Sequence, residues 1–155
     1  MSDLVGRVTN LLAEYAASID ENRLEDWVEL FAEAGSYRVV PRENHDQGLP
    51  VPLILCRNKK MIRDRIKALR NANEYNLHHD LHIIGAPRVV VISPTECSVR
   101  ASYVVYQTTL EGQSRLFSVG RYEDRVQVTD DRLRFLEKLV VVDSFSVPTL
   151  LATPL

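Results

Sequence analysis

The order of the apolar patterns constrains the fold most: helical periods fill the first part of the chain and strand-like segments fill the second. Apolar residues from Leu4 to Ile19 recur at the spacing of one helix face, and Asp20–Asn22 ends the pattern. From Leu81 onward, short turns separate β-branched and alternating segments. Helices first and strands later favour an α+β domain. We therefore expect N-terminal helices packed on a curved antiparallel β-sheet that closes into a cone.

Between these two halves the sequence predicts several shorter elements. A second helix carries Trp27 and Phe31 on its apolar side, and Asn58 suits the N-cap of a third helix. Strands that are joined by short turns pair in antiparallel fashion. The elements predicted after the first helix are a helix over 24–31, a turn at 33–36, strands at 37–40 and 53–56 separated by a loop at 41–52, a helix over 58–72, and strands at 82–84, 88–92, 98–105, 116–128 and 133–142.

Length and charge restrict the class of protein. The 155 residues predict a single domain over residues 1–155, and the net charge of −2 argues against a general binder of nucleic acid or anionic membranes. No apolar run reaches the ~20 residues of a membrane helix, and the N-terminus lacks the apolar core of a secretory signal. Cys56 and Cys97 lie far apart and outside any C-x-x-C motif. We therefore expect a cytoplasmic protein with reduced thiols.

The helix predicted over 58–72 has a basic outer face. Its positive residues follow helical spacing at Lys59, Arg63, Lys67 and Arg70. A nucleic-acid strip would need interleaved aromatic residues, which are missing here. A solvated face, or a face that meets an acidic partner, is the favoured interpretation.

Four residues are candidates for proton-transfer chemistry: Tyr15, Asp20, Tyr37 and His82. If they point into the cone, a desolvated histidine–aspartate pair with tyrosine hydroxyls would suit an isomerase or a dehydratase. The alternative is structural, because Asp20 also marks the end of the first helix and tyrosines commonly pack half-buried.

Three of the four histidines fall within five positions, in the stretch from His78 to His82. His78 and His82 are four residues apart, and with Asp80 they have the residue types of a two-histidine, one-carboxylate iron site. The competing interpretation makes His82 a hydrogen-bonded residue that opens a strand. His78 and His79 would then be solvated or would lie at a subunit contact.

The whole chain resembles the small (β) subunit of bacterial aromatic-ring-hydroxylating dioxygenases, in the nuclear-transport-factor-2-like (NTF2-like) superfamily. The resemblance lies in the order and spacing of several segments rather than in one motif. The segments are YAASIDENRLEDWVELFAEAGSY (15–37), PRENHDQGLP (41–50), KKMIRDRIKALRNANEYNLHHDLHIIG (59–85), SVGRYEDR (118–125) and LRFLEKLVVVDS (133–144).

This resemblance implies an NTF2-like (cystatin-like) cone and a non-catalytic, structural role. Such subunits form a trimer that supports three large (α) subunits, which hold a Rieske [2Fe–2S] cluster and a mononuclear iron. The loop at 41–50 is most similar to subunits that serve aromatic carboxylates such as salicylate, terephthalate or benzoate. The resemblance implies that this chain carries no cofactor, metal or catalytic residue. The residues agree for the Rieske centre, because neither Cys56 nor Cys97 has the closely spaced histidine that such a centre needs. Leu81–His82 stands where family members often have an Arg-His pair.

Two functions therefore stand as hypotheses. A structural subunit should expose an apolar patch that assembly covers, and its tail over 146–155 should dock on the sheet or on a neighbour. A free-standing isomerase or dehydratase should instead have a deep pocket with Asp20 or His82 in its floor. The strand residues that could belong to the cone interior or to the patch are Val104, Tyr106, Phe117, Tyr122 and Phe135.

Overall fold

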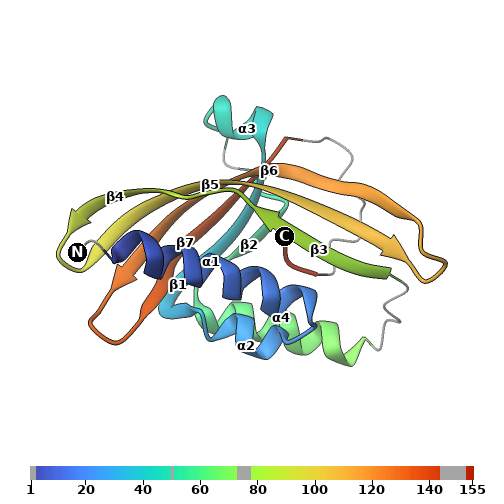
Figure 1. The fold of residues 1–155 in the computed structure, drawn as a ribbon, viewed down its shortest axis with the longest axis horizontal. Helices are drawn as coiled ribbons and strands as arrows, with labels where there is room; N and C mark the ends of the chain where they lie inside the picture. The colour runs from blue at the N-terminus through green and yellow to red at the C-terminus, as the bar shows by residue number, and fades with distance from the viewer. Residues whose placement is uncertain (1–2, 50, 73–77, 144–152) are drawn as a thin grey trace.

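A curved β-sheet with its longer helices on one side dominates the computed structural model of this chain (Figure 1). The structure describes residues 3–49, 51–72, 78–143 and 153–155. Its helices are α1 (Leu4–Asp20), α2 (Leu24–Val28), α3 (Arg42–Asp46) and α4 (Lys59–Asn71). Its strands are β1 (Phe31–Pro41), β2 (Ile54–Cys56), β3 (His78–Ile84), β4 (Arg88–Ser93), β5 (Glu96–Thr109), β6 (Ser114–Val128) and β7 (Leu133–Val142).

The sheet is mixed rather than wholly antiparallel, which corrects one part of the expectation. The strand order is β2-β1-β7-β6-β5-β3, and β4 also pairs with β5. The successive strands β5, β6 and β7 pair antiparallel as expected, but β1 and β7 run parallel, with Tyr37 opposite Lys138. Local patterns could not show this pairing, because it joins the first and last strands of the chain.

The first strand begins earlier than the sequence indicates. The second helix ends at Val28, and Phe31 already belongs to β1, so the helix predicted over 24–31 was too long. The turn expected at 33–36 is a register irregularity within β1, between Phe31 and Ser36. Gly35 suits this position, because a Cβ atom there would lie 2.6 Å from the carbonyl oxygen of Phe135. A close backbone approach thus explains a glycine that resembled a turn signal.

Two further local expectations were wrong. The segment after β1 is not all loop, since it contains the short helix α3 on the sheet side opposite α1, α2 and α4 (Figure 1). Lys59 lies in α4 but not on its exposed face, because its side chain is buried and its ammonium donates to Glu29 at 3.1 Å. The predicted N-cap is confirmed: the side chain of Asn58 accepts from the main-chain N–H of Met61.

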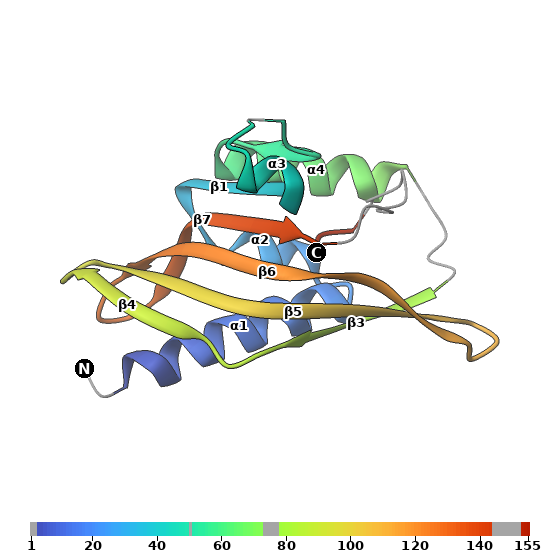
Figure 2. The same cartoon turned by 90° about the horizontal axis from the view of Figure 1, so that it is seen from above.

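The main core fills the space between the helices and the sheet. The apolar face of α1 buries Val8, Leu11, Leu12, Tyr15 and Ile19 against the inner face of the sheet. Figure 2 shows α1 lying beneath the long strands, with α4 beyond β1. The expected α+β class, with N-terminal helices packed on a curved sheet, is confirmed.

The alternation of the strands decides which apolar side chains reach this core. Tyr122 and Phe135 are fully buried within it, whereas Tyr106 is exposed and Val104 and Phe117 are half-buried. The five residues that were undecided from sequence therefore divide between the two faces. The inner positions of β5, including Val99 and Val105, are buried as the period of two predicts.

Candidate functional site

The structure brings Asp20 and His82 into direct contact. Asp20 is the last residue of α1, and His82 lies in β3, opposite Val105 of β5. One carboxylate oxygen of Asp20 lies 2.6 Å from the imidazole Nδ1 of His82, and the other accepts the main-chain N–H of His82 at 2.8 Å. The imidazole is fully buried, while 15% of the Asp20 side chain is exposed. A single carboxylate thus fixes both the backbone and the ring of its partner.

This contact lets us assign the tautomer of the imidazole. An ionised carboxylate only accepts hydrogen bonds, so Nδ1 of His82 carries the hydrogen. The other ring nitrogen, Nε2, is buried and has no hydrogen-bond partner among the described residues. In a neutral imidazole this nitrogen is an acceptor, which is the arrangement that a general base requires.

Asp80 lies near this pair on the same side of β3. Burial raises the pKa of its carboxyl group, and the nearby His78 opposes the increase. One carboxylate oxygen of Asp80 lies 3.6 Å from Nε2 of His78, whose ring nitrogen is also 3.3 Å from the side-chain nitrogen of Gln107. The inner side of β3 therefore carries an alternating polar row of His78, Asp80 and His82.

The spacing of this row does not favour a metal centre. His78 and His82 lie on one extended strand, so four residues place their Cα atoms about 13 Å apart instead of one helical turn apart. Within the described ranges, no three histidine, cysteine, aspartate or glutamate side chains form a group that could hold a metal ion. Tyr75, Asn76 and Leu77, which precede the row in sequence, lie outside those ranges.

Tyr15 and Tyr37 are held together by a residue that the sequence did not single out. The hydroxyl of Tyr15 donates to the main-chain oxygen of Leu155 at 2.5 Å, and the main-chain N–H of Leu155 donates to the hydroxyl of Tyr37 at 3.0 Å. All three residues are buried in the main core. The four candidate residues thus form two separate hydrogen-bonded groups, Asp20 with His82 and Tyr15 with Tyr37.

The position of Leu155 tests part of the prediction that the tail over 146–155 docks on the sheet or on a neighbour. Residues 146–152 lie outside the described ranges, but residues 153–155 are described and Leu155 is only 1% exposed. This end of the tail docks inside the fold, between the tyrosines of α1 and β1.

Sequence reasoning missed a buried ion pair between Lys138 and Asp124. The ammonium of Lys138 donates to Asp124 at 2.9 Å, and both side chains are fully buried. The ammonium also lies 3.4 Å from the ring centroid of Tyr122 and 4.2 Å from that of Tyr15, distances typical of cation–π contacts. The predicted strand over 133–142 carries three charged residues, Arg134, Glu137 and Lys138, and its sequence does not show which of them is buried.

Burial dominates the titration of this pair. It lowers the pKa of Lys138 to about 8, although the carboxylate of Asp124 opposes that change. It also raises the pKa of Asp124 to about 6, against the stabilising effect of the Lys138 ammonium. The rings of Tyr15, Tyr122 and Phe135 surround the ammonium, and neither side chain of the pair is exposed, so we assign the pair to the core and not to a reaction centre.

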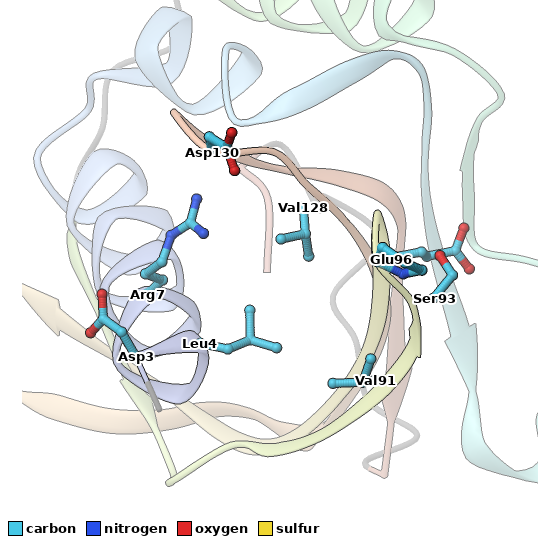
Figure 3. Close-up of a pocket in the computed structure, with 9 residues that line it drawn as sticks. Asp3, Leu4, Arg7, Val91, Ser93, Glu96, Val128 and Asp130 are labelled. Atoms are coloured by element: carbon cyan, nitrogen blue, oxygen red, sulfur yellow. The ribbon is translucent and has the colours of Figure 1, made fainter. Parts of the chain in front are cut away.

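A hollow of about 640 Å³ opens at the N-terminal end of α1 (Figure 3). Leu4, Val91 and Val128 form its apolar wall, and Arg7 points across it toward Asp130. The guanidinium of Arg7 is already engaged, because it donates to the main-chain oxygen of Thr129 at 2.6 Å. The carboxylate of Glu96 is bound by Arg125 through two hydrogen bonds. Among the described residues that line this hollow, none forms a buried acid–base pair, so the hollow suits contact with an apolar group rather than catalysis.

A second hollow, of about 250 Å³, lies between α1 and the end of β3 and includes His82 in its wall. The side chain of His82 has no exposed surface, so only its main chain faces this hollow. The remaining wall is largely apolar, with Leu12, Ala16 and Ile84. The imidazole therefore does not reach solvent through this opening.

The outer side of the sheet carries an exposed apolar surface. We define the outer apolar surface as Leu81, Ile83, Tyr106 and Leu116, whose exposed fractions run from 39% to 55%. Leu81 stands opposite Tyr106, which stands opposite Leu116 on the next strand. Neighbouring positions on β3, β5 and β6 thus join into one patch. Such patches commonly mark contacts between proteins.

None of the helices in the described part of the chain combines the length and the hydropathy that a membrane span requires.

Comparisons with known proteins agree with this geometry. The sequence matches the SnoaL-like domain family over residues 3–138. It is 42% identical over 141 residues to the anthranilate 1,2-dioxygenase small subunit of Burkholderia cepacia, covering 91% of this chain and 88% of that protein. It is 35% identical over 143 residues to a β subunit of the terminal oxygenase component of terephthalate 1,2-dioxygenase from Comamonas sp, covering 92% and 93% of the two chains.

A solved structure extends the likeness to three dimensions. The crystal structure assigned to the β subunit of an aromatic-ring-hydroxylating dioxygenase from Novosphingobium aromaticivorans DSM 12444 matches with a TM-score of 0.89 and 36% sequence identity. The match covers 97% of this chain and 95% of that chain.

Proposed function

We propose that this chain, which belongs to the family of small (β) subunits of aromatic-ring-hydroxylating dioxygenases, supports an iron-containing large (α) oxygenase subunit and has no catalytic residues of its own. The chain would act as one NTF2-like domain over residues 1–155, in the cytoplasm. It would associate as a trimer on which the large subunits are mounted.

The outer apolar surface carries this proposal. Burying Leu81, Ile83, Tyr106 and Leu116 would remove from water side chains that are 39–55% exposed in the single chain. Removal of apolar area from water is the main driving force of stable association. The candidate polar residues face the other way, into the core, where Tyr15 and Tyr37 already bind Leu155. The chain therefore offers a surface for contact more readily than a pocket for reaction.

The cofactors of the complex are assigned to the partner. A Rieske [2Fe–2S] cluster needs two cysteines and two histidines in close spacings. Both cysteines of this chain are buried as free thiols, and burial raises the pKa of each, which opposes the thiolate form that binds iron. These residues do not fit the cluster, so we place the cluster and the mononuclear iron in the large subunit.

The substrate of the complex is proposed to be an aromatic carboxylate. Two similar proteins take their names from anthranilate and terephthalate, which are both aromatic carboxylates. Salicylate and benzoate belong to the same chemical class. The choice among them would lie with the large subunit.

Coexpression tests the proposal. The tagged chain should copurify with its large subunit and with iron, and a variant with both Leu81→Lys and Leu116→Lys should lose the large subunit or the trimer while it stays folded by circular dichroism. Val5→Lys provides a matched control, because Val5 is 53% exposed but lies on α1, away from this surface. Assembly of the double variant at wild-type yield would refute the role of the outer apolar surface.

One observation favours a second function, that of a free-standing isomerase or dehydratase. The Asp20–His82 pair has the geometry of an oriented base, with Nε2 of His82 unbonded among the described residues. This function requires turnover by the isolated chain and its loss on His82→Ala substitution. A chain that is inactive alone and copurifies with an iron-bearing partner supports the structural role instead.

A further inference from the structure

We propose that the free edge of β4 receives an extended segment of the large (α) subunit, which joins the sheet as a further strand. The segment would place an apolar side chain in the hollow beside Val91 and a carboxylate beside Arg88. The identity of the partner rests on the proposed function, whereas the shape and the charge of this edge are properties of the chain itself.

Strand β4 leaves one side of its backbone unpaired. Within the described ranges, β5 is its only partner strand. Three consecutive apolar residues of β4, Val90, Val91 and Ile92, are 51–62% exposed. Apolar strands at an open sheet edge readily pair with an extended segment of another chain. The edge of β4 is therefore a candidate for such an addition.

The neighbouring part of the same edge is protected. β3 and β4 pair with successive parts of β5, and in β3 the carboxylate of Asp20 accepts the main-chain N–H of His82 at 2.8 Å. This side chain occupies a group that an added strand would need. Among the described residues, no side chain is hydrogen-bonded in this way to the main chain of β4, so this part of the edge stays open.

The hydrogen bonds beside β4 show which of its main-chain groups are free. The N–H of Gly85 donates to the main-chain oxygen of Ser102, so Ser102 of β5 faces this edge. Main-chain groups of alternate residues point the same way, so Arg100 faces it too and bonds with the opposite residue, Arg88. By the same alternation, the main-chain groups of Val91 point outward, where a further strand can bind them.

The side chain of Val91 lies at the wall of the hollow of about 640 Å³. Leu4, Val91 and Val128 face this space from α1, β4 and β6 (Figure 3). In a strand paired with β4, the side chain opposite Val91 would lie on the same side of the sheet. A large apolar side chain at that position would therefore enter the hollow.

The other side of β4 carries positive charge that is only partly balanced. Arg88 and Arg100 are exposed and lie directly opposite each other, and like charges in this arrangement destabilise a sheet. Glu123 lies 3.8 Å from Arg100, but Arg88 forms no ion pair in the described part of the chain. A carboxylate on the added strand, opposite Arg88, would balance this charge.

These features define the sequence of the added segment. A second copy of β4 cannot supply the carboxylate, because the strand RVVVIS has no acidic residue. In an antiparallel segment, the residue that follows three positions after the one opposite Val91 lies opposite Arg88 and on the other side of the sheet. The segment should therefore have an apolar residue followed three positions later by an aspartate or a glutamate.

A fluorescent seven-residue peptide tests the site on the isolated full chain. It has leucine at its third position, glutamate at its sixth and threonine elsewhere, and fluorescence anisotropy measures its binding. Moving the glutamate to the fifth position should weaken binding at least about tenfold, because the carboxylate then turns to the side of the leucine, away from Arg88. Serine in place of the leucine should weaken binding by a similar factor. Equal binding of the three peptides would overturn the proposed site.

Coexpression with the large subunit tests the partner. Arg88→Glu should lower the yield of copurified large subunit at least about tenfold, while its new carboxylate pairs with Arg100 and leaves the fold intact. Val91→Pro should have the same effect, because it removes an outward N–H and a free edge tolerates proline. Arg57→Glu is the matched control, since Arg57 is exposed and follows β2, at the opposite edge of the sheet.

The outcomes separate this contact from the proposed function. If the wild-type chain copurifies with the large subunit and both β4 variants do so at the same yield, the edge of β4 is not the contact and the proposed function stands. If the wild-type chain retains no large subunit, the proposed function fails, and the partner assigned to this edge fails with it.

Discussion

The carboxylate of Asp20 binds His82 twice, through the ring nitrogen Nδ1 at 2.6 Å and through the main-chain N–H at 2.8 Å. The two residues are 62 positions apart and belong to α1 and β3. The pair therefore fixes the C-terminal end of α1 to β3, the strand at one edge of the sheet. This role is structural in the folded chain, whatever chemistry the imidazole could perform.

The Asp20–His82 pair should contribute measurably to stability. Asp20→Ala and His82→Ala should each lower the free energy of unfolding by about 2–3 kcal/mol, because each leaves a buried polar partner unpaired. The double variant should cost less than the sum, with a coupling energy of about 1–2 kcal/mol in urea unfolding. His79→Ala is the matched control, because His79 is exposed on the same strand and its removal should change stability by less than about 0.5 kcal/mol. If the stability loss of the double variant equals the sum of the two single losses, the contact contributes no coupling energy.

Replacing one member of the Lys138–Asp124 pair should destabilise the fold more than replacing both members. Lys138→Met leaves the Asp124 carboxylate buried without its cation and should cost roughly 3–5 kcal/mol. Combining Lys138→Met with Asp124→Leu should restore most of that loss, because burying two charges costs about as much as their attraction returns. Chemical denaturation measures both effects. A double variant as unstable as the single one would contradict this account.

The same pair should make stability depend on pH in a characteristic way. Burial raises the pKa of Asp124 from its ordinary 3.8 to about 6. Between pH 3.8 and 6 the folded state therefore binds more protons at this carboxyl group than the unfolded state does. Stability consequently falls as the pH rises from 3.8 to 6. The pKa of Lys138 is lowered from 10.5 to about 8, so the unfolded state holds the extra proton there and stability rises from about pH 8 to 10.5.

The measurement is the difference in unfolding free energy between the wild type and the Lys138→Met, Asp124→Leu double variant across pH. The stability of the wild type relative to the double variant should be lowest between about pH 6 and 8. It should rise by at most about 3 kcal/mol as the pH falls below 6 or increases above 8. A difference that is constant with pH would mean that the pair is not desolvated as described.

Gly120 should not tolerate a side chain. A Cβ atom there would lie 2.0 Å from the carbonyl oxygen of Val141 and 2.9 Å from a ring carbon of Tyr103. Gly120→Ala should therefore lower the free energy of unfolding by about 3 kcal/mol or more. Gly85→Ala is the control, since its nearest contact would be an ordinary 3.6 Å from Ser102. Thermal unfolding of the two variants side by side checks the prediction, and equal stability would contradict it.

Some errors of the sequence analysis have clear physical causes. The Glu33–Ser36 stretch has the composition of a turn, but Gly35 serves a close backbone approach inside β1. Lys59 has the spacing of an exposed helical face, but Glu29 of the neighbouring segment draws its ammonium inward. In both cases a partner distant in sequence overrides the local pattern. Likewise, the spacing of His78 and His82 gave no reliable geometry until the strand was known.

The sequence by itself determined the classes and limits of most elements and the faces that they bury. It did so because apolar periodicity, turn residues and helix caps act through near neighbours in the chain, as in α1, α4 and the alternating strand β5. Only the tertiary structure decided that β1 pairs in parallel with β7, that Lys138 has a buried counter-ion in Asp124, and that Leu155 occupies the space between Tyr15 and Tyr37. Those relationships depend on hydrogen bonds and charges that meet across the folded core, and no local pattern encodes which distant residue will supply the partner.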